Sequence, residues 1–415
     1  MPDTYYDLIK AQKLERTALD KRMAEDANLL YLKKYVLSDK DDKAVPDIVN
    51  VTLNRPAVFG ASVVASLGST SEQVVVESDD KKVDTHEIEV FLDAAFSSAN
   101  RRRWKRGKPL LNPFADAQFC FRGRTGRRVL LRVKDGIPIV DIEPWDGRYI
   151  FSEQSEDGLK WAGLETKRLK STILTDYGIT IAGEKGEVTD IWDATHNEVW
   201  IDGHLVREEE HSYGYCPVIL QVVSLGYGPM LLDEGWQKNE GESIFFMIRD
   251  IVPEMNRLAT ILQTLNLNQL KAALQYQSPD GSPTDEPPDR PKMGDVVSVG
   301  KGQLVPINMG QALASFQQLN GIIEKAFQEG SYTDIDIGNV QQPFSAVALI
   351  AIGENKDTVY LPRLAAKELL NVATAEMLIQ QALQIGGSIE VDNPGHKRVF
   401  STSSLKGEYE VSYKY

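Results

Sequence analysis

The sequence IFFMIRDIVPEMNRLATILQTL, residues 244–265, sets the architecture of the chain because seven apolar residues recur in it at a regular spacing. We call these seven the apolar seam: Ile244, Ile248, Ile251, Met255, Leu258, Leu262 and Leu265. Alternating steps of four and three residues are typical of a helix that buries one stripe against another helix. The pattern predicts a helix over 243–276, about 50 Å long at 1.5 Å per residue. Pro253 either kinks this helix one turn upstream or marks its beginning.

The segment that follows this helix is predicted to project from the protein. Residues 278–291 hold five prolines and no large apolar residue, so they form an exposed loop. Two short β runs, 296–299 and 304–307, predict a small hairpin. Apolar residues at helical spacing over 313–327 then predict a returning helix. The order is therefore long helix, small projecting unit and returning helix.

The remaining parts of the chain differ in their predicted structure. The first 67 residues carry apolar positions at helical spacing, whereas 129–206 consists of short β runs. The pair Asp202-Gly203 lies between two of these runs and is a strong hairpin signal. Helical spacing returns over 344–383, and three more β runs follow it. The predicted fold class is α+β, with an antiparallel β unit in the middle.

Composition and charge exclude several classes of protein. The chain has 415 residues, a net charge of −14 and 42% hydrophobic residues, values that exclude a disordered tail. Its acidity argues against a protein that simply coats nucleic acid. Cys120 and Cys216 are too few for a disulfide scaffold. We find no signal peptide and no apolar window that could span a membrane, so we expect synthesis in the cytoplasm and no membrane partner.

Motif searches give no convincing catalytic or metal site. The string nearest to a phosphate-binding loop, residues 300–303, lacks the first glycine and the hydroxyl residue of that motif. A Cys216–His211 nucleophile pair lacks an orienting acid. Five potential metal ligands lie close in sequence but would rarely converge on one ion from a hairpin: Asp193, His196, His204, His211 and Cys216. We therefore expect no enzymatic activity, no catalytic residue, no metal and no cofactor.

One charged segment stands out from the acidic background. Residues 101–134 contain 12 basic residues and one acidic residue, Asp116. Nine of them make up the candidate basic patch: Arg101, Arg102, Arg103, Lys105, Arg106, Arg122, Arg124, Arg127 and Arg128. Arginine pairs with both carboxylate and phosphate, so the patch predicts contact with an acidic face of a neighbouring subunit or with DNA. The acidity of the whole chain favours the neighbouring subunit.

The order of these elements resembles that of the portal proteins, the head-to-tail connectors of tailed bacteriophages. Three short strings also resemble that family: HSYGYCPV at 211–218, SAVAL at 345–349 and SLKGEYEV at 404–411. They are similar, in turn, to the end of the wing sheet, the start of the helix after the tunnel loop, and a late strand. Ala346 stands where the family usually has glycine. The order of the strings along the chain carries the resemblance.

The resemblance implies a division of the chain into the parts of a portal subunit. Residues 1–242 form most of the wing, 243–276 the first stem helix, 277–310 the clip and 311–329 the second stem helix. Residues 330–344 form the tunnel loop, 345–385 the long wing helix, and 386–415 strands of the wing or the start of a crown. A less favoured tunnel loop is 353–360. The crown helices usual in the family are not recognised.

The resemblance also implies a function and a set of partners. The chain forms a homo-oligomeric ring, a dodecamer, at one capsid vertex of the virion, after synthesis in the cytoplasm of the bacterial host. Double-stranded DNA passes through the ring during packaging and ejection. The ring docks a terminase-type packaging motor and tail adaptors, and it contacts major capsid or scaffolding proteins. A separate ATPase supplies the energy.

Specific residues follow from this interpretation. The apolar seam would be buried between stem helices of neighbouring subunits, since an exposed stripe of this length would be poorly soluble. The DNA-facing residues of the tunnel loop would be Tyr332, Asp334, Asp336, Asn339, Gln341 and Gln342. The alternatives are a nucleic-acid-binding protein or enzyme that uses the basic patch, and another virion connector.

Overall fold

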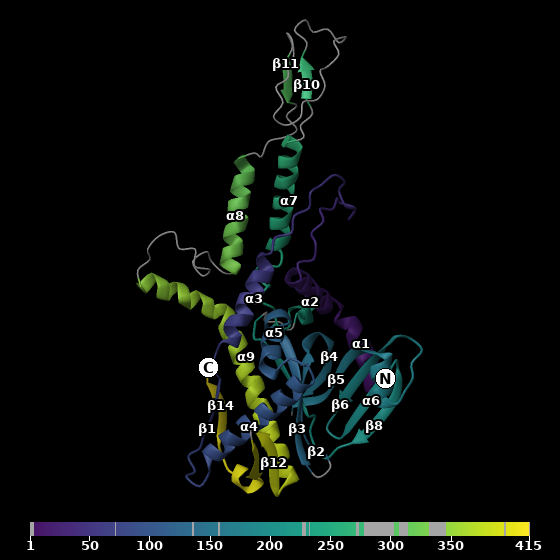
Figure 1. Ribbon diagram of the computed structural model, residues 1–415, viewed down its shortest axis with the longest axis vertical. Helices are drawn as coiled ribbons and strands as arrows, with labels where there is room; N and C mark the ends of the chain where they lie inside the picture. Colours follow the sequence, from purple (N-terminus) through teal and green to yellow (C-terminus); the bar gives the residue numbers. More distant parts are fainter. Residues whose placement is uncertain are drawn as a thin grey trace. The chain divides into compact units, whose positions relative to one another are not determined.

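The computed structural model describes residues 4–414 except 71, 135–136, 157, 226–229, 232, 271–273, 278–302, 307–313, 332–345 and 394–395. Its chain divides into two compact units. Unit 1 comprises Met1–Ala27, Val58–Phe246 and Gln342–Tyr415, and unit 2 comprises Asn28–Ala57 and Met247–Gln341. Both units mix helices with strands, which confirms the α+β class (Figure 1).

Unit 1 contains the predicted antiparallel β structure as two sheets. The three-stranded sheet has the order β3-β2-β9 and consists of β2 (Arg124–Lys134), β3 (Ile137–Asp146) and β9 (Val218–Val222). The five-stranded sheet runs in sequence order through β4 (Ile150–Ser155), β5 (Gly158–Leu169), β6 (Lys185–Trp192), β7 (His196–Ile201) and β8 (His204–Glu210). Asp202 and Gly203 join β7 to β8 with φ values of 48° and 86°. Positive φ at both positions is what a type I′ turn requires, and the predicted hairpin is confirmed.

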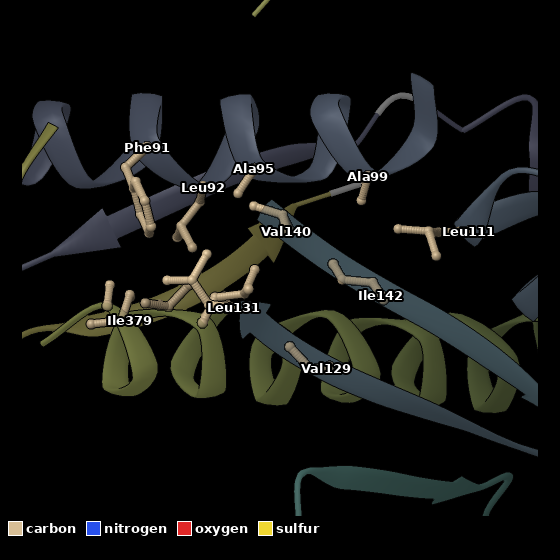
Figure 2. Packing of buried hydrophobic residues seen from close by; sticks show 14 of the residues in the cluster. Phe91, Leu92, Ala95, Ala99, Leu111, Val129, Leu131, Val140, Ile142 and Ile379 are labelled. Atoms are coloured by element: carbon tan, nitrogen blue, oxygen red, sulfur yellow. The ribbon is translucent and has the colours of Figure 1, made fainter. Parts of the chain in front are cut away.

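The core of unit 1 lies where helices cover the three-stranded sheet. The helices are α4 (Thr85–Lys105), α5 (Leu111–Phe121) and α9 (Ala346–Ile385). Figure 2 shows apolar side chains of α4, β2, β3 and α9 meeting between the two longer helices. α9 continues through Pro362 and covers 353–360, so the less favoured position of the tunnel loop is wrong.

Shorter elements complete the chain. In unit 1 β1 (Gln73–Glu77) pairs with β14 (Glu410–Lys414), and β12 (Ser388–Asn393) pairs with β13 (His396–Ser401). The remaining helices are α1 (Tyr5–Glu15), α2 (Thr17–Leu30), α3 (Arg55–Gly68) and α6 (Lys170–Tyr177). Short 3₁₀ turns cover Gly147–Tyr149, Trp236–Asn239 and Thr402–Leu405. Among the described residues no helix is long and apolar enough to cross a membrane.

Unit 2 contains the predicted pair of long helices, with different boundaries. α7 (Ile251–Leu270) and α8 (Ala314–Gly330) pack side by side (Figure 1). The expected helix over 243–276 is therefore too long at both ends. Pro253 lies in the first turn of α7, where its missing N–H removes no hydrogen bond, so the helix begins there rather than kinking.

The small hairpin is described only in part. β11 (Gln303–Pro306) lies where a strand was expected and pairs with β10 (Leu274–Gln277), whereas 296–299, its expected partner, lies outside the described residues. Residues 274–277 had been assigned to the end of the long helix. The sequence of 274–277 fits both a helical spacing and a short β run. Its strand partner, Gln303–Pro306, lies too far along the chain for local patterns to decide between the two.

An extended segment of unit 2, residues 49–53, lies along α7, and we call it the strap. Alternate N–H groups of the strap donate to side chains four residues apart on the helix: Val49 to Thr264 Oγ1 at 3.1 Å, Val51 to Thr260 Oγ1 at 2.9 Å and Leu53 to Asn256 Oδ1 at 2.9 Å. The two spacings match, because two extended residues span about 6.7 Å and four helical residues about 6.0 Å. The N–H groups of the strap therefore bond to side chains of a helix, where those of a β-strand would bond to the backbone of a neighbouring strand.

Replacing Thr260 by Val is expected to release the strap. The two side chains have the same shape, but valine leaves the N–H of Val51 without its acceptor, at a cost of about 1–3 kcal/mol. Hydrogen exchange at Val51 should become faster in Thr260→Val, whereas Thr260→Ser, which keeps the hydroxyl, should behave like the wild type. Unchanged exchange in Thr260→Val would mean that the hydroxyl does not hold the strap.

Candidate functional site

The apolar seam is largely covered by the chain itself. Ile244, Ile248, Met255 and Leu258 are all buried, with exposed fractions of 5%, 0%, 5% and 6%. The other three, Ile251, Leu262 and Leu265, are half-buried. The expectation of an open stripe is therefore wrong for the first four residues. The error was to treat 244–265 as one isolated helix, because Ile244 and Ile248 lie before α7 and α8 packs against α7.

The outer face of α8 carries the exposed apolar side chains that the seam lacks. Leu319 and Ile322 are 45% and 65% exposed, and a spacing of three residues places them on one face of the helix. Phe327, in contrast, is buried beneath the guanidinium of Arg55, which lies 5.4 Å from its ring centre and also pairs with Glu324. α8 thus has a covered face and an exposed apolar face, and the exposed face is the better candidate for contact with another molecule.

The candidate basic patch is not one surface. Arg103, Arg124 and Arg127 are only 5%, 3% and 0% exposed, so they cannot contact DNA or a neighbouring subunit. Acids from other segments neutralise several of the arginines: Arg103 pairs with Glu143 at 2.9 Å, Arg122 with Asp146 at 3.5 Å and Arg124 with Glu240 at 3.2 Å. The charge count in sequence missed these partners because they lie far along the chain.

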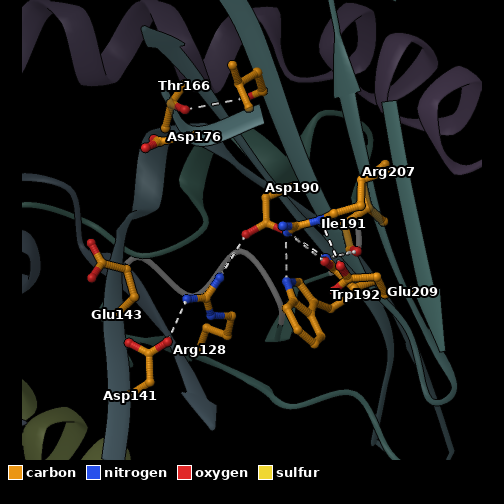
Figure 3. Close-up of polar contacts among 12 residues, drawn as sticks. Arg128, Asp141, Glu143, Thr166, Asp176, Asp190, Ile191, Trp192, Arg207 and Glu209 are labelled. Atoms are coloured by element: carbon orange, nitrogen blue, oxygen red, sulfur yellow. Dashed lines mark hydrogen bonds and ion pairs between the residues drawn. The ribbon is translucent and has the colours of Figure 1, made fainter. Parts of the chain in front are cut away.

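Arg128 joins the two sheets of unit 1 and is likewise structural. Its guanidinium pairs with Asp190 at 3.0 Å and Asp141 at 3.4 Å, and it lies over the ring of Trp192 (Figure 3). Asp190 also accepts hydrogen bonds from Trp192 Nε1 at 2.9 Å and Asn197 Nδ2 at 2.7 Å. Of the predicted patch, Arg101 and Arg102 are half-buried, and Lys105 and Arg106 are exposed. Only this end of the patch is open to a partner.

Arg127 shows what the buried arginines do instead. It donates to Asn112 Oδ1 at 2.9 Å and to Asn371 Oδ1 at 2.5 Å, and so connects β2 with α5 and α9. The guanidinium of Arg127, which the sequence suggested for binding a partner, instead holds β2, α5 and α9 of unit 1 together.

A buried ion pair fixes α9 against α5. Lys367 Nζ lies 3.1 Å from Asp116 Oδ1, and both side chains are less than 5% exposed. Burial raises the pKa of Asp116, while the charges of Lys367 and Arg127 oppose that rise. Four residues earlier on α9, Arg363 donates to the carbonyl of Glu242 at 3.3 Å. The long helix is therefore held by polar as well as apolar contacts within unit 1.

The residues expected to face DNA lie outside the described part of the chain. These are Tyr332, Asp334, Asp336, Asn339, Gln341 and Gln342, and most of the predicted clip lies outside it as well. Their assignment rests on the sequence alone.

Cys216 and His211 are held by contacts within unit 1, whereas His204 is exposed on β8. The Cys216 thiol is buried and donates to the carbonyl of Trp192 at 3.3 Å, and burial raises its pKa to about 12, far from a thiolate nucleophile. His211 lies against the rings of Trp192 and Tyr213, and burial lowers its pKa. No group of three or more His, Cys, Asp or Glu side chains within the described ranges could hold a metal ion.

Comparison with known proteins adds no family to this description. No protein-family model matches the chain, and no curated protein matches it. The function is therefore argued from the order of the elements and from the groups that the chain leaves exposed.

Proposed function

We propose that the chain is a portal-type connector of a tailed bacteriophage. In this proposal twelve copies form a ring at one capsid vertex, and double-stranded DNA passes through the ring during packaging and ejection. The observation that carries the proposal is the order of the long helices along the chain, α7 and α8 in unit 2 followed by α9 in unit 1. Two long helices, α7 and α8, pack side by side, a two-stranded antiparallel pair lies between them in sequence, and the 40-residue helix α9 follows. This order resembles that of a portal stem, clip and wing helix, and the proposal rests on that resemblance.

In this proposal, neighbouring subunits contact each other through apolar residues that are exposed or half-buried in the single chain. Leu319 and Ile322 on α8 would meet a neighbouring stem, together with the half-buried Ile251, Leu262 and Leu265 of the seam. Apolar side chains exposed on one helix face are a common mark of an interface. The buried seam residues instead stabilise the stem of each subunit.

The charge of the chain supports a DNA channel that does not grip DNA. Twelve copies at −14 carry about −170 charges, and an acidic wall attracts DNA only weakly. At physiological ionic strength the screening length is about 8 Å, so repulsion acts mainly close to the wall. A separate ATPase motor would supply the work, and the clip would dock that motor and the tail adaptors. Capsid or scaffolding proteins would contact the ring.

The nucleic-acid alternative is weakened by burial. A protein that grips phosphates with the basic patch needs those arginines at its surface, whereas Arg103, Arg124 and Arg127 are buried. We therefore expect the purified chain to bind duplex DNA no more tightly than non-specific proteins do, with a Kd weaker than about 10⁻⁶ M at physiological salt. Fluorescence anisotropy across a salt series tests this. Nanomolar binding that weakens steeply with salt would favour the alternative.

Negative-stain imaging tests the proposal itself. The purified chain should give ring-shaped particles with a central hole, most of them of one symmetry. Particles without a hole, or single compact molecules at all concentrations, would contradict it.

A further inference from the structure

A cavity in unit 1 has walls rich in oxygen atoms, and of its lining residues only Asn112, which accepts a hydrogen bond from Arg127, takes part in a contact described so far. It holds about 170 Å³ and lies among α4, α5, β1 and β14. Its polar lining comes from Glu72, Asp93, Ser97, Asn100, Asn112 and Tyr413. Two carboxylates, two amides and two hydroxyls therefore face a single hollow.

The hydroxyl of Tyr413 is the unusual member of this lining. Tyr413 is only 7% exposed, yet its hydroxyl has no hydrogen-bond partner in the part of the chain that the structure describes. Its ring is fixed edge-on to Phe96, with 6.1 Å between the ring centres. A buried hydroxyl without a partner costs about 1–3 kcal/mol and is rare in native structures, where a bound water or ion is one explanation of it.

The charges around this hydroxyl favour a positively charged ligand. Burial raises the pKa of Tyr413, and the charges of Glu72 and Asp93 raise it further, while Arg127 opposes them. The hydroxyl therefore stays protonated and neutral, with its oxygen available to accept a hydrogen bond from a cation. Asp93 lines the cavity, is exposed, and forms no ion pair among the described residues.

The lining distinguishes an organic cation from a metal ion. Glu72 already accepts hydrogen bonds from the side-chain amides of Asn112 and Asn371, so its oxygens are not free to surround a metal. The described residues offer no group of three metal-ligating side chains, at this site or elsewhere.

The face of α4 beside the cavity carries groups that the alkyl chain and the charge of a basic side chain can contact. Asp93, Ser97, Asn100 and Trp104 follow one another on a single face of α4, in steps of four and three residues. Trp104 is 71% exposed, and a cation or its alkyl stem can pack on such a ring. The face thus offers a carboxylate, a hydroxyl, an amide and an indole in one row.

We propose that this cavity binds an organic cation, a guanidinium or ammonium group. The cation comes either from a basic side chain of another polypeptide or from a free small molecule. Tyr413 accepts a hydrogen bond from it, and Asp93 and Glu72 balance its charge. The proposal does not depend on ring formation, since every residue that it uses lies in unit 1.

Calorimetric titration of the full chain with ethylguanidinium and with propylammonium tests the proposal. The wild type should show saturable binding of at least one of the two cations. Tyr413→Phe should weaken that binding about tenfold, the effect expected for one hydrogen bond to a charged group. Asp93→Asn should weaken it several-fold. Asp79→Asn, which removes the same charge from an exposed residue outside the cavity, should bind like the wild type.

The melting temperature of each variant serves as the control for correct folding. Because the Tyr413 hydroxyl has no partner, Tyr413→Phe should melt at the wild-type temperature or slightly above it. A lower melting temperature would mean that the hydroxyl is satisfied within the protein and would overturn the assignment. Absence of saturable binding, or equal binding by wild type and Tyr413→Phe, would overturn it as well.

A second measurement tests whether the cation comes from a second copy of the chain. If an excess of the cation that binds lowers the mass of wild-type assemblies in light scattering, a basic side chain of a second copy occupies the cavity. If the mass stays unchanged, the occupant is a free cation or a side chain of a different protein. Either result is consistent with the cavity as a cation site and differs only in the source.

Discussion

Replacing Ile322 by Asp is expected to leave each chain folded and to prevent rings from forming. Ile322 is 65% exposed, and substitutions at such positions usually change the free energy of unfolding by less than about 0.5 kcal/mol. In a ring the same side chain would be buried against a neighbour, where an unpaired carboxylate costs several kcal/mol per contact. Since the ring repeats this contact in every subunit, the effect on assembly is multiplied. Light scattering should show 46.3 kDa monomers.

Two matched variants control this experiment. Gln317→Asp places the same charge on an exposed polar position of α8, on the side away from Leu319 and Ile322, and should leave assembly unchanged. Leu258→Asp changes a residue of α7 that is 6% exposed, so it should unfold unit 2 rather than merely separate subunits. Intact rings of Ile322→Asp would show that the outer face of α8 is not an interface.

Removing the lysine of the buried ion pair should give the largest loss of stability in unit 1. In Lys367→Met the carboxylate of Asp116 stays buried without its charged partner, at an expected cost of about 3–5 kcal/mol. Urea unfolding followed by tryptophan fluorescence measures this loss. All six tryptophans lie within 104–236, so the signal reports on unit 1 and is insensitive to unit 2.

The double variant Asp116→Leu/Lys367→Met is the control. It removes both charges, and apolar replacements of buried ion pairs are often close to neutral. The double variant should therefore regain most of the stability that Lys367→Met loses. If the single and double variants are equally unstable, lost packing rather than an unpaired charge explains the effect.

Local signals in the sequence predicted much of the fold. The apolar spacing of α7, α8 and α9 and the Asp202-Gly203 turn are set by neighbouring residues, and each structure was found where it was expected. Helix ends were less accurate, because Pro253 permits either a kink or a start and the sequence pattern left both open. The strap could not be predicted, since its pairing uses side chains of a helix about 200 residues away.

The candidate sites were harder to predict than the fold. Charge density in sequence suggested a basic surface, but β2 directs Arg127 inward, and the partners of Arg124 and Arg128 come from other elements. The seam was correctly recognised as apolar, whereas its cover, supplied in part by α8, depends on tertiary packing. The cavity beside Tyr413 gave no sequence signal, because its lining comes from four separated segments.

The molar mass of the purified chain in solution tests the central proposal most directly. Light scattering coupled to size exclusion at physiological salt should give about 0.56 MDa, twelve times the 46.3 kDa chain, for a closed ring. A mass of 46.3 kDa that stays constant as the protein concentration rises would contradict the portal-type assignment.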